Sequence, residues 1–407
     1  MRVIEGSITT PKGFQVSSLH AGLKRAKNDL AIIYSSSILT AAGVFTKNLL
    51  KAPPVVWSER IVKEEQGVKA MIINSANANA CTGDVGSANV IRTADATANL
   101  LGIKREEVLV FSTGVIGVQL PMDKMLAGIE KIDASMGSSR EDARQVAEAI
   151  MTTDTYSKEV CIEFEIDGKV TCIGGIAKGS GMIHPNMATM LSFLTTDVAI
   201  SKELLQKALT ESTDRTYNMI SVDGDTSTND SAIIVTNGLL GNTRIDDENS
   251  EAYRIFSQAL DMANEALAVA IVKDGEGATK LIEVCVNAAD TVENARILAK
   301  SVISSNLVKT AIFGQDANWG RIVCALGYAE VDFDQFKIEL YFGSDAGTIK
   351  VFDKGMPLEF DEEFALKILQ EKSIRIEINM NNGSCEAKAW GCDLSFEYVR
   401  INGQYRT

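Results

Sequence analysis

The sequence predicts a mixed α/β protein built from more than one compact part. Short apolar runs bounded by Gly, Asn and Lys, which are typical of strands, occur along the chain together with segments of helical periodicity. The chain has 407 residues, of which 45% are apolar and 23% are charged. This length exceeds one small hydrophobic core, so we expect two or three domains or subdomains, although no change in composition marks a boundary.

The strand and helix patterns can be followed in order. In the first part we expect strands at 31–34, 43–45, 68–73 and 108–111 and helices at 87–101 and 139–151. Alternating apolar residues on both sides of Asp167-Gly168 predict a hairpin that joins 160–166 to 169–176, followed by a strand at 190–194. In the second part we expect helices at 201–213, 250–271, 292–303 and 362–370, and strands at 232–235, 281–286, 337–342, 349–352, 374–379, 386–390 and 394–399. Asn382-Gly383 predicts a second tight hairpin.

The charge balance and the apolar runs limit the class of protein. A formal net charge of −14 argues against nucleic acid or an anionic membrane as the partner, because both require a basic surface. The N-terminal residues contain no apolar core of signal-peptide length, and the longest strongly apolar run, 266–272, is too short to span a membrane. We therefore expect a cytoplasmic protein.

Cysteine and histidine counts restrict the possible chemistry. The seven cysteines are scattered and include no Cys-x-x-Cys pair, so we expect buried free thiols and no metal site. His20 and His184 are the only histidines, which nearly excludes a His-rich zinc site and leaves few candidates for a Ser-His-Asp triad. His184 either helps to position the loop that follows it or is a turn histidine held by backbone contacts.

The stretch KGSGMIHPNMATML, residues 178–191, is the first candidate site. Small Ala188 and the upstream glycines would let the backbone bend so that the Thr189 hydroxyl attacks the carbonyl before it. Cleavage there would give Thr189 a free α-amine beside its hydroxyl, which is the threonine–amine pairing of covalent catalysis. The local pattern alone favours a turn that enters a buried strand.

Three further stretches have compositions typical of ligand sites. The strand at 108–111 runs into Thr113-Gly114, a hydroxyl and an unobstructed amide suited to an oxyanion hole. Glu276 lies between two glycines, as either a solvent carboxylate or one aimed into a cleft. The loop at 221–230 has alternating carboxylates but lacks the glutamate of a calcium loop, so we expect a polar loop lining a site.

Six ordered motifs together resemble one family, the ornithine acetyltransferases of arginine biosynthesis, also called glutamate N-acetyltransferases. They are NANACTG, MTTDT, KGSGMIHPNMATML, KDGEGATK, GQDANWGR and YVRINGQYRT. The resemblance implies a layered α/β architecture of N-terminal-nucleophile type with a second smaller α/β lobe. It also implies self-cleavage between Ala188 and Thr189 into chains 1–188 and 189–407, which form one intertwined catalytic unit and assemble as two copies of each chain.

The same resemblance assigns residues to roles in acetyl transfer from N2-acetyl-L-ornithine to L-glutamate. It implies that Thr189 is the nucleophile and that Thr113 and Gly114 form the oxyanion hole. Substrate contacts are implied for the nucleophile itself and for five other residues: Thr155, Lys178, Glu276, Asn402 and Thr407. We expect no metal or organic cofactor, with acetyl-CoA as a possible second acetyl donor. The alternatives are an N-terminal-nucleophile amidase or aminopeptidase and, more distantly, an amino-acid-binding protein.

Overall fold

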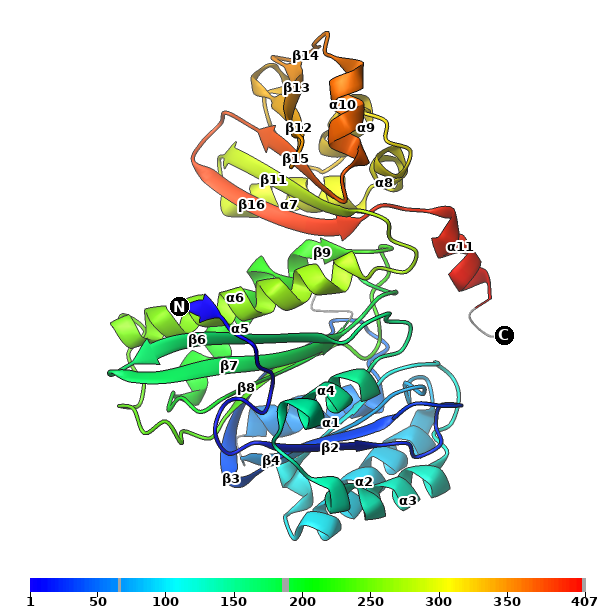
Figure 1. Cartoon of the computed structure of the whole chain (residues 1–407), viewed down its shortest axis with the longest axis vertical. Coiled ribbons are helices and arrows are strands. Elements are labelled where there is room, and N and C mark those ends of the chain that lie inside the picture. The colour runs from blue at the N-terminus through cyan, green and yellow to red at the C-terminus, as the bar shows by residue number, and fades with distance from the viewer. Residues whose placement is uncertain (65–66, 185–189, 405–407) are drawn as a thin grey trace. The chain divides into compact units, whose positions relative to one another are not determined.

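The computed structural model divides the chain into two compact units, each with its own sheet (Figure 1). It describes residues 1–64, 67–184 and 190–404. The large unit contains the described parts of 1–179, 186–217 and 225–267, and the small unit contains those of 180–185, 218–224 and 268–407. The mixed α/β class is therefore confirmed. The unit boundaries do not coincide with the predicted division into 1–188 and 189–407, which stays a prediction.

The large unit is built on a nine-stranded sheet in the order β1-β6-β7-β8-β10-β3-β4-β5, with β2 also paired to β3. Its strands are β1 Arg2–Val3, β2 Gln15–Leu19, β3 Leu30–Phe45, β4 Val68–Asn74, β5 Val108–Ser112, β6 Lys158–Ile166, β7 Lys169–Lys178, β8 Leu191–Thr196 and β10 Ser231–Thr236. Most are almost fully buried, as expected for strands covered on both faces.

Strand β3 corrects the sequence prediction of two separate strands at 31–34 and 43–45. It is one strand of 16 residues whose first part pairs with β2 and β4 and whose last part pairs with β10. The register to β4 shifts between Tyr34 and Leu39. The polar residues Ser35, Ser36 and Ser37 fill that irregular stretch, which is why the pattern resembled a break.

The predicted hairpin is confirmed. β6 and β7 pair along their whole length around Asp167 and Gly168, whose φ angles of 53° and 71° are those of a tight hairpin turn. β7 then pairs antiparallel with β8, and Lys178 lies directly opposite Leu191. The two ends of the KGSGMIHPNMATML stretch are therefore adjacent in the sheet.

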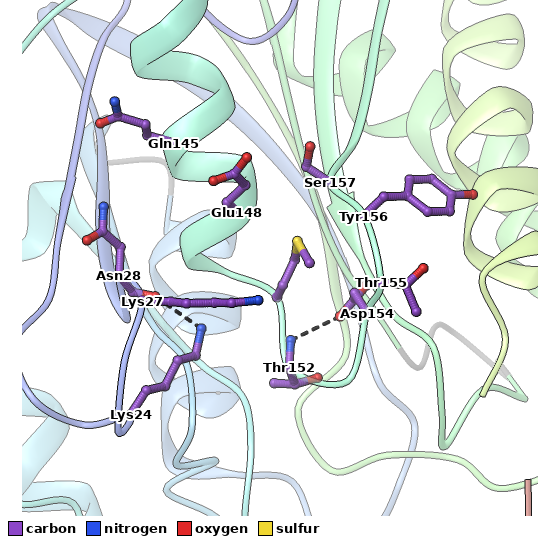
Figure 2. Close-up of a pocket in the computed structure, with 11 residues that line it drawn as sticks. Lys24, Lys27, Asn28, Gln145, Glu148, Thr152, Asp154, Thr155, Tyr156 and Ser157 are labelled. Carbon is purple, nitrogen blue, oxygen red and sulfur yellow. Dashed lines mark hydrogen bonds between the residues drawn. The ribbon is translucent and has the colours of Figure 1, made fainter. Parts of the chain in front are cut away.

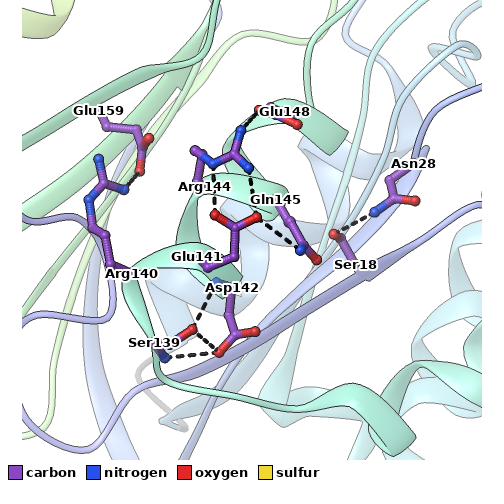
Figure 3. Close-up of polar contacts among 10 residues, drawn as sticks. All are labelled: Ser18, Asn28, Ser139, Arg140, Glu141, Asp142, Arg144, Gln145, Glu148 and Glu159. Atoms are coloured by element: carbon purple, nitrogen blue, oxygen red, sulfur yellow. Dashed lines mark hydrogen bonds and ion pairs between the residues drawn. The ribbon is translucent and has the colours of Figure 1, made fainter.

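The helices of the large unit cover its sheet and contribute to the core. They are α1 Pro53–Glu64, α2 Gly83–Leu101, α3 Met122–Ile132, α4 Arg140–Ala149 and α5 Lys202–Arg215, together with α6 Glu251–Lys273, whose last residues belong to the small unit. The helix predicted at 139–151 is confirmed as α4, and a capping box begins it, since Ser139 Oγ accepts a hydrogen bond from Asp142 N at 3.1 Å (Figure 3). The sequence analysis predicted no helix at α1, which begins with Pro53-Pro54, although proline suits a first helical turn.

The small unit contains a seven-stranded sheet in the order β14-β13-β12-β15-β11-β16-β9. Its strands are β9 Ile220–Ser221, β11 Leu281–Ala289, β12 Glu339–Ser344, β13 Gly347–Asp353, β14 Met356–Pro357, β15 Ser373–Asn379 and β16 Cys385–Cys392. Its helices are α7 Val292–Ser304, α8 Asn306–Phe313, α9 Trp319–Gly327, α10 Glu362–Gln370 and α11 Phe396–Gly403. α7 packs on β11 and β16, and α10 packs on β12.

Two predictions for the small unit were wrong. Asn382-Gly383 does not form a tight hairpin, because β11 lies between β15 and β16 and pairs with both. The stretch 394–399 is not a strand. Ser395 Oγ instead accepts a hydrogen bond from Glu397 N at 3.2 Å and begins helix α11, which shows that a short alternating pattern does not distinguish a strand from one helical turn.

The seven cysteines are all free thiols, as predicted, but only four of them are buried. Cys81 and Cys324 are exposed. Among the described residues, one helix, α6, is long and apolar enough to cross a membrane, yet half of the relevant window is buried inside the protein. A core helix of a globular protein has the same signature, so this is weak evidence of a membrane span.

Candidate active site

The Thr113-Gly114 turn follows β5 and is fixed by the neighbouring end of β4. Thr113 N donates to the Asn74 carbonyl at 3.0 Å, and Val115 N donates to the Ala76 carbonyl at 3.1 Å. Gly114 has a φ of 134°, and a Cβ there would lie 2.1 Å from the Ala76 carbonyl carbon. The turn therefore requires glycine, both for its backbone angle and for its close approach to another backbone segment.

Given the oxyanion-hole role that the family resemblance implies for Gly114, replacing it with alanine is expected to lower kcat for acetyl transfer by about 10²–10³-fold, because the amide is displaced. Steady-state kinetics on the purified variant measure this loss. Gly117→Ala is the matched control, since Gly117 also has a positive φ, 80°, but a Cβ there meets nothing within 4 Å. Similar kcat values for the Gly114 and Gly117 variants would contradict a specific role for Gly114.

A buried carboxylate that the sequence analysis missed, Asp154, connects two of the predicted substrate residues. Its Oδ1 accepts hydrogen bonds from Lys158 Nζ at 2.6 Å and from Gly179 N at 2.7 Å, and its Oδ2 accepts from Thr152 N at 3.0 Å. Gly179 follows Lys178, and Thr155 follows Asp154. The structure thus brings Thr155 and Lys178 to the same end of β7 in the large unit.

The electrostatics of Asp154 depend on two lysines. Burial opposes its ionisation, but the positive charges of Lys158 and Lys178 outweigh that effect and hold the pKa of the Asp154 carboxyl below its usual value. The side chains of Asp154 and Lys158 are both fully buried. Asp154 is therefore an anion near neutral pH, and it stabilises the segment that carries Lys178.

A cavity of about 490 Å³ opens beside Thr155 in the large unit (Figure 2). Its walls come from 24–28, the C-terminal turn of α4 and the loop 151–157. Lys24 and Lys27 project into it from one wall, opposite Thr155 and Tyr156. Its volume lies within the range of pockets that bind small molecules.

Glu276 lies in the small unit and is buried, not a solvent carboxylate. Its Oε2 accepts a hydrogen bond from Asn402 Nδ2 at 2.7 Å, so two predicted substrate residues are in direct contact. Glu276 N donates to the Ser180 carbonyl at 2.8 Å. A Cβ added to Gly181 would lie 2.5 Å from each carboxylate oxygen of Glu276. Because Gly181 has no side chain, the Glu276 carboxylate can occupy this space.

Gly181→Ala is expected to displace the Glu276 carboxylate and to raise KM for N-acetylornithine about tenfold, through loss of the substrate contact that the family resemblance implies for Glu276. The fold should survive, because the displaced atoms are the end of a flexible side chain. Comparison of KM and melting temperature with Gly327→Ala tests this, since a Cβ at Gly327 meets nothing within 4 Å. An unchanged KM with a lowered melting temperature would mean that Gly181 serves packing alone.

His184 lies beside the small unit's own polar groups. Its Nδ1 is 3.0 Å from Ser221 Oγ and 3.5 Å from Ser304 Oγ. Burial, together with the nearby Lys300, lowers the pKa of His184 to about 4, and burial lowers the pKa of Lys300 to about 7. A neutral imidazole held by hydroxyl groups suits a positioning role. The sequence analysis named backbone contacts for His184, and these two contacts are to serine side chains.

Ala188, Thr189 and Thr407 lie outside the described residues. In the polar loop at 221–230, Asp223 accepts hydrogen bonds from Met182 N at 2.6 Å and from Ile183 N at 2.8 Å, so it supports the segment before His184. Across the described part of the chain, no group of three or more Asp, Glu, His or Cys residues is arranged to hold a metal ion.

The fold is a two-sheet α/β protein. Its large unit holds the Thr113-Gly114 turn and the supported Lys178, and its small unit holds the buried Glu276 in contact with Asn402. Comparison with known proteins identifies the family. The chain belongs to the ArgJ family, whose model matches residues 15–407. This confirms the resemblance that the six motifs indicated.

Individual relatives extend along the whole chain. It is 51% identical over 407 residues to the arginine biosynthesis bifunctional protein ArgJ of Caldanaerobacter subterraneus, covering 100% of both chains. It is 51% identical over 398 residues to the protein of the same name from Thermotoga neapolitana, covering 98% of this chain and 99% of that protein. A crystal structure of the Bacillus halodurans ArgJ protein is 45% identical, with a TM-score of 0.50, and covers 52% of this chain and 98% of that chain.

Proposed function

We propose that the protein transfers the acetyl group of N2-acetyl-L-ornithine to L-glutamate through an acetyl-Thr189 intermediate, as an acyltransferase of arginine biosynthesis. The observation that carries this proposal is the full-length match to proteins named as bifunctional enzymes of arginine biosynthesis. The Thr113-Gly114 turn, Lys178 and the Glu276–Asn402 pair supply the groups that the reaction requires.

The nucleophile is proposed to arise by self-cleavage between Ala188 and Thr189. The solved Bacillus halodurans chain supports a two-chain product, because it is matched over 98% of its length yet covers only 52% of this chain. Residues 189–407 also make up just over half of the sequence. The pairing of Lys178 with Leu191 gives further support, since it would keep both new chain ends joined to one sheet after cleavage.

We propose two steps, acetylation of Thr189 by N-acetylornithine and then transfer of the acetyl group to glutamate. The Thr189 hydroxyl attacks the acetyl carbonyl while its α-amine, with an ordinary pKa of about 7.7–8.0, accepts the hydroxyl proton. Thr113 and Gly114 stabilise the tetrahedral oxyanion, and the C–N bond breaks as the amine returns the proton to ornithine. Lys178 balances the substrate carboxylate, and Glu276 balances the ornithine ammonium. Glutamate then enters, and its amine takes the acetyl group from Thr189.

The term bifunctional in the relatives' names supports a second activity, and we propose acetyl-CoA:glutamate acetyl transfer through the same Thr189. Acetyl-CoA is then a co-substrate, and the residues named above complete the reaction without an organic cofactor or a metal ion. We also propose a cytoplasmic heterotetramer of two 1–188 chains and two 189–407 chains. Size-exclusion chromatography with light scattering tests this assembly.

Incubation of the purified protein with N-acetylornithine and glutamate tests the first activity. We expect ornithine and N-acetylglutamate in equal amounts, with parallel lines in double-reciprocal plots because the acetyl group is carried by the enzyme between the two substrates. An amidase would instead release acetate at a rate independent of glutamate. That result would contradict the proposal.

A further inference from the structure

Two lysines meet in the cavity beside Thr155. Lys24 Nζ donates hydrogen bonds to the Asn28 carbonyl at 3.1 Å and to the Ala149 carbonyl at 3.0 Å, which fixes its ammonium at the cavity wall. Lys27 is exposed and extends across the opening (Figure 2). Its φ of 72° is a left-handed angle that non-glycine residues rarely adopt, and His20 Nδ1 lies 2.7 Å from its carbonyl oxygen. The backbone thus maintains an unfavourable angle that directs this side chain.

Carboxylates lie near the two lysines, because Glu148 and Asp154 line the same cavity and Asp29 and Asp154 attract the Lys24 ammonium. Over the residues that the structure describes, neither lysine forms an ion pair within 4.0 Å. Glu148, which lines the cavity, pairs instead with Arg144 at 2.6 Å. The Asp29 carboxylate is occupied by backbone amides, including Lys24 N at 2.8 Å. Two ammonium groups that reach one cavity without a close ion pair among the described residues are the groups that an anionic ligand would contact.

The cavity is connected to the proposed oxyanion hole through three hydrogen bonds. The Ala149 carbonyl that holds Lys24 also accepts a hydrogen bond from Ser75 Oγ at 2.6 Å. The preceding residue, Asn74, accepts the hydrogen bond from Thr113 N. The cavity wall and the Thr113 turn therefore belong to one buried hydrogen-bonded network of the large unit, and Thr113 itself is not among the residues that line the cavity. The cavity volume of about 490 Å³ exceeds what a single amino acid fills.

We propose that Lys24 and Lys27 bind the phosphate groups of acetyl-CoA, so that this cavity is the donor subsite of the second activity. The inference rests on the proposed function, because it needs acetyl transfer through Thr189. In this step the Thr189 hydroxyl forms an ester bond to the acetyl carbon and the C–S bond breaks. The proton taken by the α-amine passes to the CoA sulfur. The acetyl enzyme is the same as that formed from N-acetylornithine, so only the donor's binding distinguishes the two reactions.

Three acetyl donors separate this role from others. Acetyl-CoA carries the phosphates, S-acetylpantetheine has the same thioester without them, and N-acetylornithine needs neither. We expect Lys27→Met and Lys24→Met each to raise KM for acetyl-CoA about tenfold, as lost charge-assisted contacts imply. KM for S-acetylpantetheine and for N-acetylornithine should not change. Lys131→Met, at an exposed lysine in the last turn of α3, is the control.

The pH dependence provides a second readout. Burial lowers the pKa of Lys24 to about 8, Asp29 and Asp154 oppose this shift, and Lys27 and Lys178 add to it. Raising the pH through about 8 therefore removes the Lys24 charge. KM for acetyl-CoA should rise over this range in the wild type, relative to KM for S-acetylpantetheine measured at each pH. The Lys24→Met variant should lack this relative rise.

Each contrary result has a defined meaning. An equal rise in KM for all three donors would show that the lysines only support the fold. Because Lys27 is exposed, its replacement should leave the fold intact. A raised KM for glutamate with both natural donors would assign the cavity to the acceptor carboxylate. A wild type that uses acetyl-CoA no better than S-acetylpantetheine would also overturn the inference. Failure of the wild type with N-acetylornithine would instead reject the proposed function itself. Calorimetric titration with CoA, weaker for Lys27→Met, tests binding independently of activity.

Discussion

The Thr189→Ala variant is expected to remain one uncut chain and to lose acetyl transfer by at least on the order of 10⁴-fold, because it lacks the hydroxyl that both cleaves the chain and carries the acetyl group. Intact-mass analysis of the denatured protein measures the first effect. The wild type should give two species, one ending at Ala188 and the other beginning at Thr189. Assay with N-acetylornithine and glutamate measures the second effect.

Thr189→Ser is the matched control for this prediction. It keeps a hydroxyl and, after cleavage, an α-amine in the same positions, so we expect cleavage and a substantial part of the transfer rate. If Thr189→Ala were cut like the wild type, then another residue would be the nucleophile of cleavage. An uncut but fully active Thr189→Ala protein would contradict the acetyl-threonine route.

Asp154→Asn is expected to lower the free energy of unfolding by about 3–5 kcal/mol, the usual effect of removing one partner from a buried ion pair. The Lys158 ammonium would then be fully buried without its carboxylate. Chemical denaturation measures the loss. The double variant Asp154→Asn/Lys158→Met should recover part of it, since the second change removes the unpaired charge. No recovery would mean that the hydrogen bonds to Thr152 and Gly179, not the ion pair, provide the stability.

The pH dependence of stability follows from the lowered pKa of Asp154. A carboxyl whose pKa is lower in the folded than in the unfolded protein stabilises the fold above the unfolded value of about 3.9, and this contribution is lost as pH falls through the folded pKa. The stability difference between wild type and Asp154→Asn should therefore be full at neutral pH and decrease below about pH 4. Glu141→Gln is the control. Its exposed pair with Arg144 (Figure 3) should not affect stability measurably.

Local patterns predicted much of the fold. The β6–β7 hairpin follows from strict alternation around Asp167-Gly168, and α4 follows from the Ser139 cap, because both signals lie within a few residues. β11 pairs with β15 and β16, and this pairing joins segments far apart in the chain. No local signal reports such pairing, so Asn382-Gly383 was mistaken for a hairpin.

For the candidate site, too, local motifs could be recognised in the sequence, whereas contacts between distant segments could not. Glycine motifs and the ordered family resemblance predicted Gly114, Lys178 and Glu276 as site residues, and the structure places Lys178 opposite Leu191 and Glu276 against Asn402. The sequence analysis did not predict a role for Asp154, because that role depends on its burial and on its ion pair with Lys158. A linear pattern shows neither. Lys24 could not be identified for the same reason, since its cavity is formed by three separate segments.

The most direct test of the central claim is to find the acetyl group on Thr189. The wild-type protein is incubated with N-acetylornithine in the absence of glutamate, quenched in acid and digested, and the peptide that begins at residue 189 is fragmented. We predict one added acetyl group as an ester on the Thr189 hydroxyl, which disappears when glutamate is supplied and reappears as N-acetylglutamate. An unmodified Thr189 under conditions of active turnover, or an acetyl group on another side chain that glutamate removes, would contradict the account.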